Sequence, residues 1–177
     1  MSRNAQYDRI IRKLEDRFTS SQTAHKILKH MHTTYEAKDN DYSATGLPMG
    51  NLRKCEDAGI EAWRGCIVRM GDKISRLENF VNQNAYMVSE KAEDTIIDLA
   101  NYAILCNCLL NEELDKSLSK YYINLTKNTM KDLVDLSYYC VFQAMLWKDN
   151  DPEKDSSNLN KVISYWDILS KYSLEMI

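Results

Sequence analysis

The chain has 177 residues, with 23 basic and 26 acidic side chains and a formal net charge of −3. This balance argues against a general electrostatic grip on nucleic acid or on an anionic membrane. The length suits one domain, or one domain with an appendage. Neither a signal peptide nor a transmembrane stretch is visible, and five cysteines without a framework spacing favour free thiols. We therefore expect a cytoplasmic protein without a membrane partner.

Residues that break helices are concentrated in one stretch. All five glycines lie between Gly46 and Gly71, and the only prolines are Pro48 and Pro152. With few alternating β-branched runs, this distribution predicts an all-α protein. Amphipathic spacing predicts helices, in chain order, over residues 4–18, 22–38, 60–81, 89–110, 114–125, 129–147 and 159–173. Turn-forming residues predict loops over 39–50 and 148–157.

The helix predicted over 60–81 carries a charged side opposite its apolar positions. Arg69, Asp72 and Arg76 share that side, with Lys73 nearby. The spacing by itself is typical of an ion-pair ladder on a solvated face. If the same side faces the acidic residues of the next helix, Asp72 becomes a candidate metal ligand and the basic residues become candidate phosphate ligands. The polar link over residues 82–88 makes the two helices antiparallel neighbours.

The helix predicted over 89–110 combines an apolar surface with carboxylates. From Thr95 onward it is apolar on almost every side, which is typical of an interior helix. Glu90, Asp94, Asp98 and Asn101 nevertheless fall within one arc of about 80°. A solvated first turn explains Glu90 well and Asp98 poorly. Because buried acids are normally paired or bound to a metal, we favour a functional acidic face.

Three segments together resemble a known family. They are Lys38-Asp39-Asn40-Asp41-Tyr42, the stretch from Gly65 to Leu77 that contains Arg69-Met70-Gly71-Asp72-Lys73, and the stretch from Glu90 to Tyr102 that contains Asp94-Thr95-Ile96-Ile97-Asp98. Their order and spacing resemble the phage-associated family called nucleotide modification associated domain 1. That family looks like a branch of the all-α, MazG-like nucleotide pyrophosphohydrolases. The resemblance covers residues 35–110, and residues 113–177 carry no recognised motif.

The resemblance implies a fold and an activity. The fold is a four-helix-bundle core within residues 1–112, with C-terminal helices over 113–177 packed on the core or on a partner subunit. The activity is hydrolysis of a nucleoside triphosphate to a monophosphate and pyrophosphate with Mg²⁺, or alternatively Mn²⁺, in a cytoplasmic homo-oligomer encoded by a phage. Where such enzymes carry the first of two acidic pairs, this chain has Arg69-x-x-Asp72, so one expected carboxylate is replaced by arginine.

Candidate roles follow from that resemblance and from the residue types. Carboxylates suit Mg²⁺, and a free carboxylate can accept a proton from an attacking water. The expected metal ligands are Asp72, Glu90, Asp94 and Asp98, with Asp94 and Asp98 also as catalytic residues. The expected substrate ligands are Arg69, Lys73, Arg76, Asn101, Lys38, Asp41 and Tyr42. Asp41 suits a turn equally well, and Tyr42 suits packing as well as base stacking.

Two other functions are consistent with the sequence. A protein whose metal site is depleted, as Arg69 indicates, would bind and sequester a nucleotide without cleaving it. A purely structural helical protein would act through its C-terminal helices, where no charge occurs from Leu136 to Trp147. Burial in a core or in a dimer interface explains that uncharged run as well.

Overall fold

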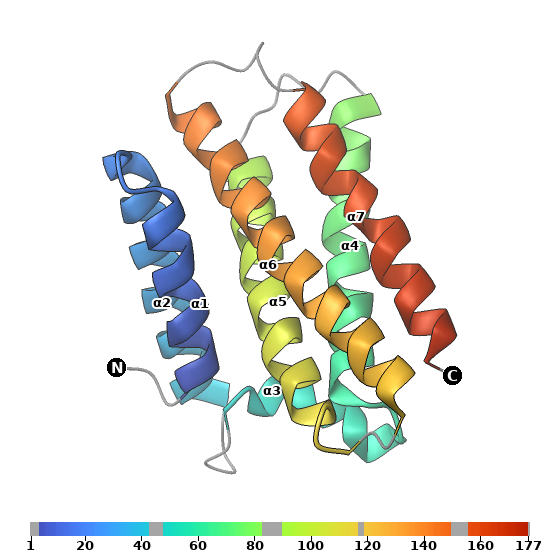
Figure 1. Cartoon of the computed structure of the whole chain (residues 1–177). Helices are drawn as coiled ribbons and strands as arrows, with labels where there is room; N and C mark the ends of the chain where they lie inside the picture. The colour runs from blue at the N-terminus through green and yellow to red at the C-terminus, as the bar shows by residue number, and fades with distance from the viewer. Residues whose placement is uncertain (1–3, 43–47, 83–89, 117–118, 150–155, 177) are drawn as a thin grey trace.

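The computed structural model describes residues 4–42, 48–82, 90–116, 119–149 and 156–176. Within these ranges the chain is all-α, as the sequence predicts, and contains no strand. The helices are α1 (Ala5–Arg17), α2 (Gln22–Tyr42), α3 (Gly50–Arg53), the 3₁₀ helix η1 (Lys54–Ala58), α4 (Ala62–Asn82), α5 (Glu90–Glu113), α6 (Lys120–Lys148) and α7 (Ser156–Glu175). The long helices run roughly along one direction, with α3 across one end (Figure 1).

Helix α5 lies at the centre of the molecule and organises the rest. It packs against α1, α2, α4 and α6. Helix α7 packs against α4 and α6 (Figure 1). Its apolar residues from Leu99 to Leu110 are buried, with the partial exception of Tyr102. This confirms the prediction that a helix apolar on nearly every side is interior. Residues of α6 and α7 belong to the same hydrophobic core as those of the earlier helices.

Two predicted boundaries are wrong. Helix α2 continues through the turn-forming residues Asp39 to Asp41 and ends at Tyr42. The two helices predicted over 114–125 and 129–147 are one helix, α6. At the junction, the hydroxyls of two threonines have partners inside the structure, while Lys127 and Asn128 are exposed. Thr126 Oγ1 lies 2.9 Å from the Tyr172 hydroxyl, and the Thr129 hydroxyl donates to the Leu125 carbonyl at 3.0 Å.

The C-terminal helix is fastened to α4 by close packing and by hydrogen bonds. A Cβ on Gly71 would lie 2.7 Å from Cη2 of Trp166, so only a glycine lets the indole approach this closely. The Arg64 guanidinium donates to the carbonyls of Ser173 and Met176 at 2.8 and 2.6 Å. It thereby satisfies carbonyls at the end of α7 that have no partner within the helix.

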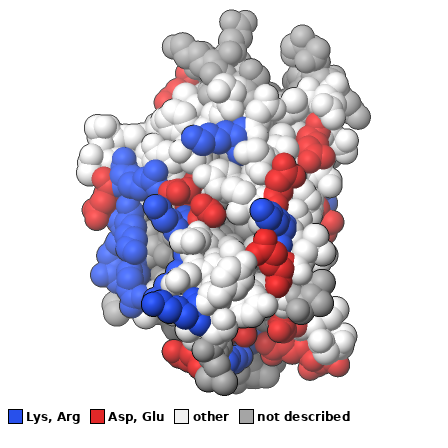
Figure 2. Space-filling model, turned by 45° about the vertical axis from the view of Figure 1, so that its right-hand side comes forward, with Lys and Arg blue, Asp and Glu red and all other residues white. Residues whose placement is uncertain are grey.

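The surface carries both signs of charge. Figure 2 shows Lys and Arg side chains gathered along one edge of the face it displays, with Asp and Glu among them and along the other edge. In the ranges the structure describes, no helix is long and apolar enough to span a membrane. All five cysteines are free thiols, as their spacing predicts.

Candidate functional site

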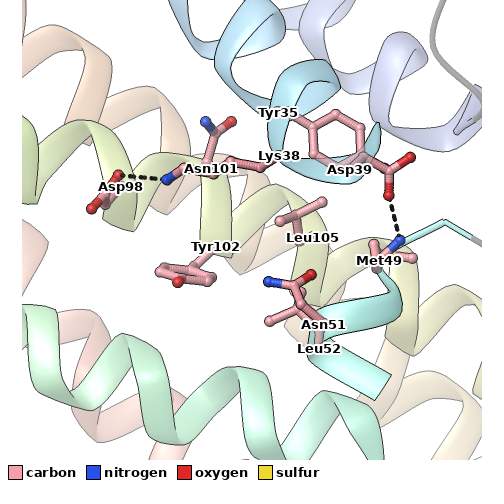
Figure 3. A pocket seen from close by; sticks show the side chains of 10 residues that line it. All are labelled: Tyr35, Lys38, Asp39, Met49, Asn51, Leu52, Asp98, Asn101, Tyr102 and Leu105. Carbon is pink, nitrogen blue, oxygen red and sulfur yellow. Dashed lines mark hydrogen bonds and ion pairs between the residues drawn. The ribbon is translucent and has the colours of Figure 1, made fainter. Parts of the chain in front are cut away.

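A pocket lies between α2, α3 and α5, at the end of the bundle where α3 crosses (Figure 3). Its empty volume, including the solvent at its mouth, is about 480 Å³. The lining residues are Tyr35, Lys38, Asp39, Met49, Asn51, Leu52, Asp98, Asn101, Tyr102 and Leu105. Three of these, Lys38, Asp98 and Asn101, are among the residues the sequence predicts. The mixture of apolar walls with a few polar groups is typical of a small-molecule site.

One side of the pocket is a carboxylate held between two ammonium groups. Asp98 Oδ2 on α5 lies 3.0 Å from Lys73 Nζ on α4, and Asp98 Oδ1 lies 3.9 Å from Lys38 Nζ on α2. The Lys73 side chain is 17% exposed, against 56% for Lys38. Two positive charges therefore face one negative charge. Lys38 lines the pocket, whereas Lys73, the more buried lysine and the one in closest contact, pairs with Asp98 from outside the lining.

The opposite side of the pocket is the short helix α3, which long-range contacts hold in place. The buried Asp39 carboxylate accepts a hydrogen bond of 2.7 Å from the Met49 amide. Met49 is in the left-handed region with φ of +61°, a conformation that few residues other than glycine adopt. Arg53 donates to the Pro48 carbonyl at 2.9 Å and pairs with both carboxylate oxygens of Glu112 on α5. The hydrogen bond to Glu112 raises the pKa of Arg53, so the guanidinium stays charged.

Asn101 lines the pocket, but its amide is used by the protein itself. Its Oδ1 accepts a hydrogen bond from the Tyr7 hydroxyl, and its Nδ2 donates to the Met31 carbonyl at 3.3 Å. Burial raises the pKa of Tyr7, which keeps the hydroxyl protonated as a donor. Asn101 thus joins α5 to α1 and α2. Both atoms of its amide therefore have protein partners, and the expected contact with a substrate stays a prediction.

The structure does not gather the expected metal ligands. Asp72 and Asp94 are exposed, and the side chain of Glu90 lies outside the described part of the chain. Asp94 lines a different hollow from Asp98, beside Lys26 and His30 of α2. Among the described residues, no three His, Cys, Asp or Glu side chains form a group able to hold a metal ion. Because Asp98 is also neutralised by lysines, the described donor set does not fit Mg²⁺ or Mn²⁺.

The other expected substrate ligands lie around the pocket or outside it. Arg69 and Arg76 are exposed and stand four residues before and three after Lys73, so they share its side of α4. Asp41 is exposed near the end of α2, and the Tyr42 side chain lies outside the described residues. The basic residues of α4 can therefore extend a positive surface from Lys73, whereas Asp41 has no place in the pocket lining.

Sequence reasoning missed four residues of the lining that carry polar groups. They are Tyr35, Asp39, Asn51 and Tyr102. Two had a signal, because Asp39 follows Lys38 and Tyr102 follows Asn101 within the segments that carry the family resemblance. Asn51 had none, since only the folding of α3 against α5 brings it to this pocket.

Residues 54–110 match the family model described as nucleotide modification associated domain 1. The resemblance seen in the sequence is thus confirmed for a segment that contains α4 and most of α5, including Lys73 and Asp98. The chain has no match among curated proteins or solved structures.

Proposed function

We propose, from the match of residues 54–110 to the family model described as nucleotide modification associated domain 1, that this chain binds a nucleotide in the pocket between α2, α3 and α5. The observation that carries the proposal is the pair of lysines on Asp98. Lys73 and Lys38 approach its two oxygens at 3.0 and 3.9 Å, as they would approach two oxygens of a phosphate.

Electrostatics favour an anion at this place. Two ammonium groups face one carboxylate at the Asp98 end of the pocket, and Lys73 is partly withdrawn from solvent. The second carboxylate of the lining, Asp39, lies at the α3 end and accepts from the Met49 amide, so the positive excess is confined to the Asp98 end. A charge in such a position interacts more strongly with a ligand than a fully solvated lysine would. Arg69 and Arg76 on the same side of α4 offer further contacts to a longer phosphate chain.

The rest of the lining suits the other end of a nucleotide. Leu52, Leu105 and the ring of Tyr102 provide apolar surface for a base, while Asn51 provides an amide. A ligand with an anionic tail and a flat, hydrogen-bonding head therefore matches both ends of the pocket. Nucleotides are the class of small molecules that combine these features and that the family description names.

Binding without cleavage is the function that the geometry supports best. No described donor set fits a divalent cation, and Asp98 is engaged by lysines, so we derive no hydrolytic step from these residues. Hydrolysis of a triphosphate to a monophosphate and pyrophosphate is the competing proposal. From the sequence resemblance we also propose that the protein is cytoplasmic, homo-oligomeric and encoded by a phage, and that it sequesters nucleotides.

The test is calorimetric titration of the full chain with the four deoxynucleoside triphosphates, with and without Mg²⁺, followed by chromatography of the recovered ligand. We expect binding with or without the cation and recovery of intact triphosphate. Release of pyrophosphate that depends on Mg²⁺ would replace the sequestration proposal with the hydrolase. If none of the four nucleotides binds, both the sequestration proposal and the hydrolase proposal are refuted.

A further inference from the structure

The polar groups that line the pocket differ in whether the protein already uses them. Asp98 is paired with Lys73, the Asp39 carboxylate accepts from the Met49 amide, and the Asn101 amide bonds to Tyr7 and Met31. The Tyr35 hydroxyl accepts from Asn4. These groups fix the walls of the pocket and have little capacity left for a ligand.

Two side chains of the lining are different. Within the described part of the chain, neither the Asn51 amide nor the Tyr102 hydroxyl has a hydrogen-bond partner, and both residues are half-buried. Figure 3 shows the Asn51 amide projecting from α3 into the space on whose other side Tyr102 lies, and Asn51 itself stands at the opposite end of the pocket from Asp98. Polar groups that face a pocket without a protein partner are the ones a ligand can satisfy.

We propose that Asn51 reads the base of the bound nucleotide and that Tyr102 supports the same end of the ligand. This inference rests on the proposed function. A carboxamide presents one donor and one acceptor side by side. It therefore complements a base edge that carries an acceptor beside a donor, as an adenine edge does for asparagine in protein–DNA complexes. The lysines recognise the phosphates, and Asn51 adds the dependence on the base.

The position of Asn51 makes this reading specific. The residue lies on α3, whose place is fixed by the Asp39 contact to Met49 and by the Arg53–Glu112 pair. A hydrogen-bonding group on a fixed element rejects ligands with the wrong pattern, since a mismatched base leaves buried polar groups unpaired. Tyr102 comes from α5, next to Asn101, which is itself held by two hydrogen bonds. Both reading groups thus stand on rigid supports.

The experiment separates the two ends of the ligand. Wild type and Asn51→Leu are titrated with the four deoxynucleoside triphosphates and with inorganic tripolyphosphate, which engages only the basic residues. Leucine keeps a similar volume and removes both hydrogen bonds. We expect wild type to rank the bases, and Asn51→Leu to lose about 10-fold or more in affinity for the preferred nucleotide. Tripolyphosphate affinity should change by less than about 2-fold, because the lysine contacts stay intact.

Two controls accompany that variant. Asn128→Leu makes the same substitution on the exposed surface of α6 and should leave the base ranking unchanged. Tyr102→Phe removes only the hydroxyl and should lower the affinity for nucleotides without changing the affinity for tripolyphosphate. Equal binding of all four bases by wild type, or an Asn51→Leu variant that keeps the wild-type ranking, overturns the inference and leaves nucleotide binding standing. Failure of wild type to bind either nucleotides or tripolyphosphate overturns the proposed function itself.

Discussion

Lys73 Nζ lies 3.0 Å from Asp98 Oδ2, and this contact joins α4 to α5 at the edge of the pocket. It decides how Asp98 can act. A carboxylate that is neutralised by an ammonium group is a poor ligand for a cation, but the same ammonium group is a good ligand for a phosphate.

Replacing Lys73 by alanine should weaken nucleotide binding. The substitution removes the less exposed of the two ammonium groups, so we expect about 10-fold lower affinity for nucleotides and for tripolyphosphate. Stability should fall by no more than about 1 kcal/mol, because Asp98 is 33% exposed and still has Lys38. Calorimetry measures the affinities, and Lys171→Ala on the exposed face of α7 is the matched control. Unchanged affinity in the Lys73 variant would remove this lysine from the site.

Replacing Asn101 by alanine should destabilise the protein. The buried Tyr7 hydroxyl would lose its acceptor and the Met31 carbonyl would lose its donor. Each unpaired buried group costs about 1–3 kcal/mol, so the free energy of unfolding should fall by about 2–4 kcal/mol. Urea denaturation measures it, with exposed Asn128→Ala as the control. A variant of wild-type stability that no longer binds nucleotides would instead make Asn101 a substrate ligand, as the sequence predicts.

Replacing Gly71 by alanine should also lower stability, although this exchange inside a helix normally raises it by about 1 kcal/mol. The new Cβ would lie 2.7 Å from Cη2 of Trp166, so the indole must shift. We expect a net loss of about 1 kcal/mol, measured by urea denaturation. Gly71→Ala should cost less in a Trp166→Phe background than in wild type, since the smaller ring leaves room for the methyl group. A more stable Gly71→Ala variant would contradict the close packing of α7 on α4.

Stability should decline at alkaline pH, in part through Cys108. Burial raises the pKa of this thiol from its ordinary value of 9.0 to about 12. Above pH 9 the unfolded chain therefore loses a proton that the folded chain keeps until about pH 12. The contribution of the buried, protonated Cys108 thiol to the free energy of unfolding is therefore fully present below pH 9. It is lost between pH 9 and pH 12, at up to about 1.4 kcal/mol per pH unit.

The measurement is the difference in unfolding free energy between pH 8.5 and pH 10.5, with a reductant present. Cys108→Ala should shrink this difference by up to about 2 kcal/mol. Some decline should persist, because burial also raises the pKa values of Tyr7 and Cys140, and a hydrogen bond with Cys106 together with burial raises the pKa of Cys66. Cys55→Ala, at a partly exposed thiol, is the control. Equal pH dependence in wild type and in Cys108→Ala would show that this thiol does not contribute.

The fold was largely predictable because apolar periodicity is local information. Helices α1, α4, α5 and α7 begin and end within about three residues of the predicted bounds. The errors arose where a distant partner satisfies a residue that usually interrupts helices. Asp39 remains helical while its carboxylate holds the Met49 amide, and Thr126 remains helical beside the Tyr172 hydroxyl. Neither partner is visible from the neighbouring sequence.

The site was less predictable, because knowing which residues share one side of a helix does not tell which other helices pack against them. Asp94 and Asp98 share one side of α5, as their spacing predicts, but they line different hollows, each beside a different part of α2. The spacing also left open whether the charged residues of α4 contact the acids of α5. In the structure Lys73 contacts Asp98. The residues that complete the pocket, such as Asn51, come from α3, whose position depends on contacts with α2 and α5.

The most direct test of the account is the affinity of Asp98→Asn for tripolyphosphate and for the preferred nucleotide, measured by calorimetry without divalent cations beside wild type and Asp94→Asn. If Asp98 occupies the place of a phosphate between Lys73 and Lys38, removing its charge should tighten binding by about 3- to 10-fold, and Asp94→Asn should match wild type. Weaker binding by Asp98→Asn than by wild type would contradict the account, because it would show that the Asp98 carboxylate helps to hold the ligand.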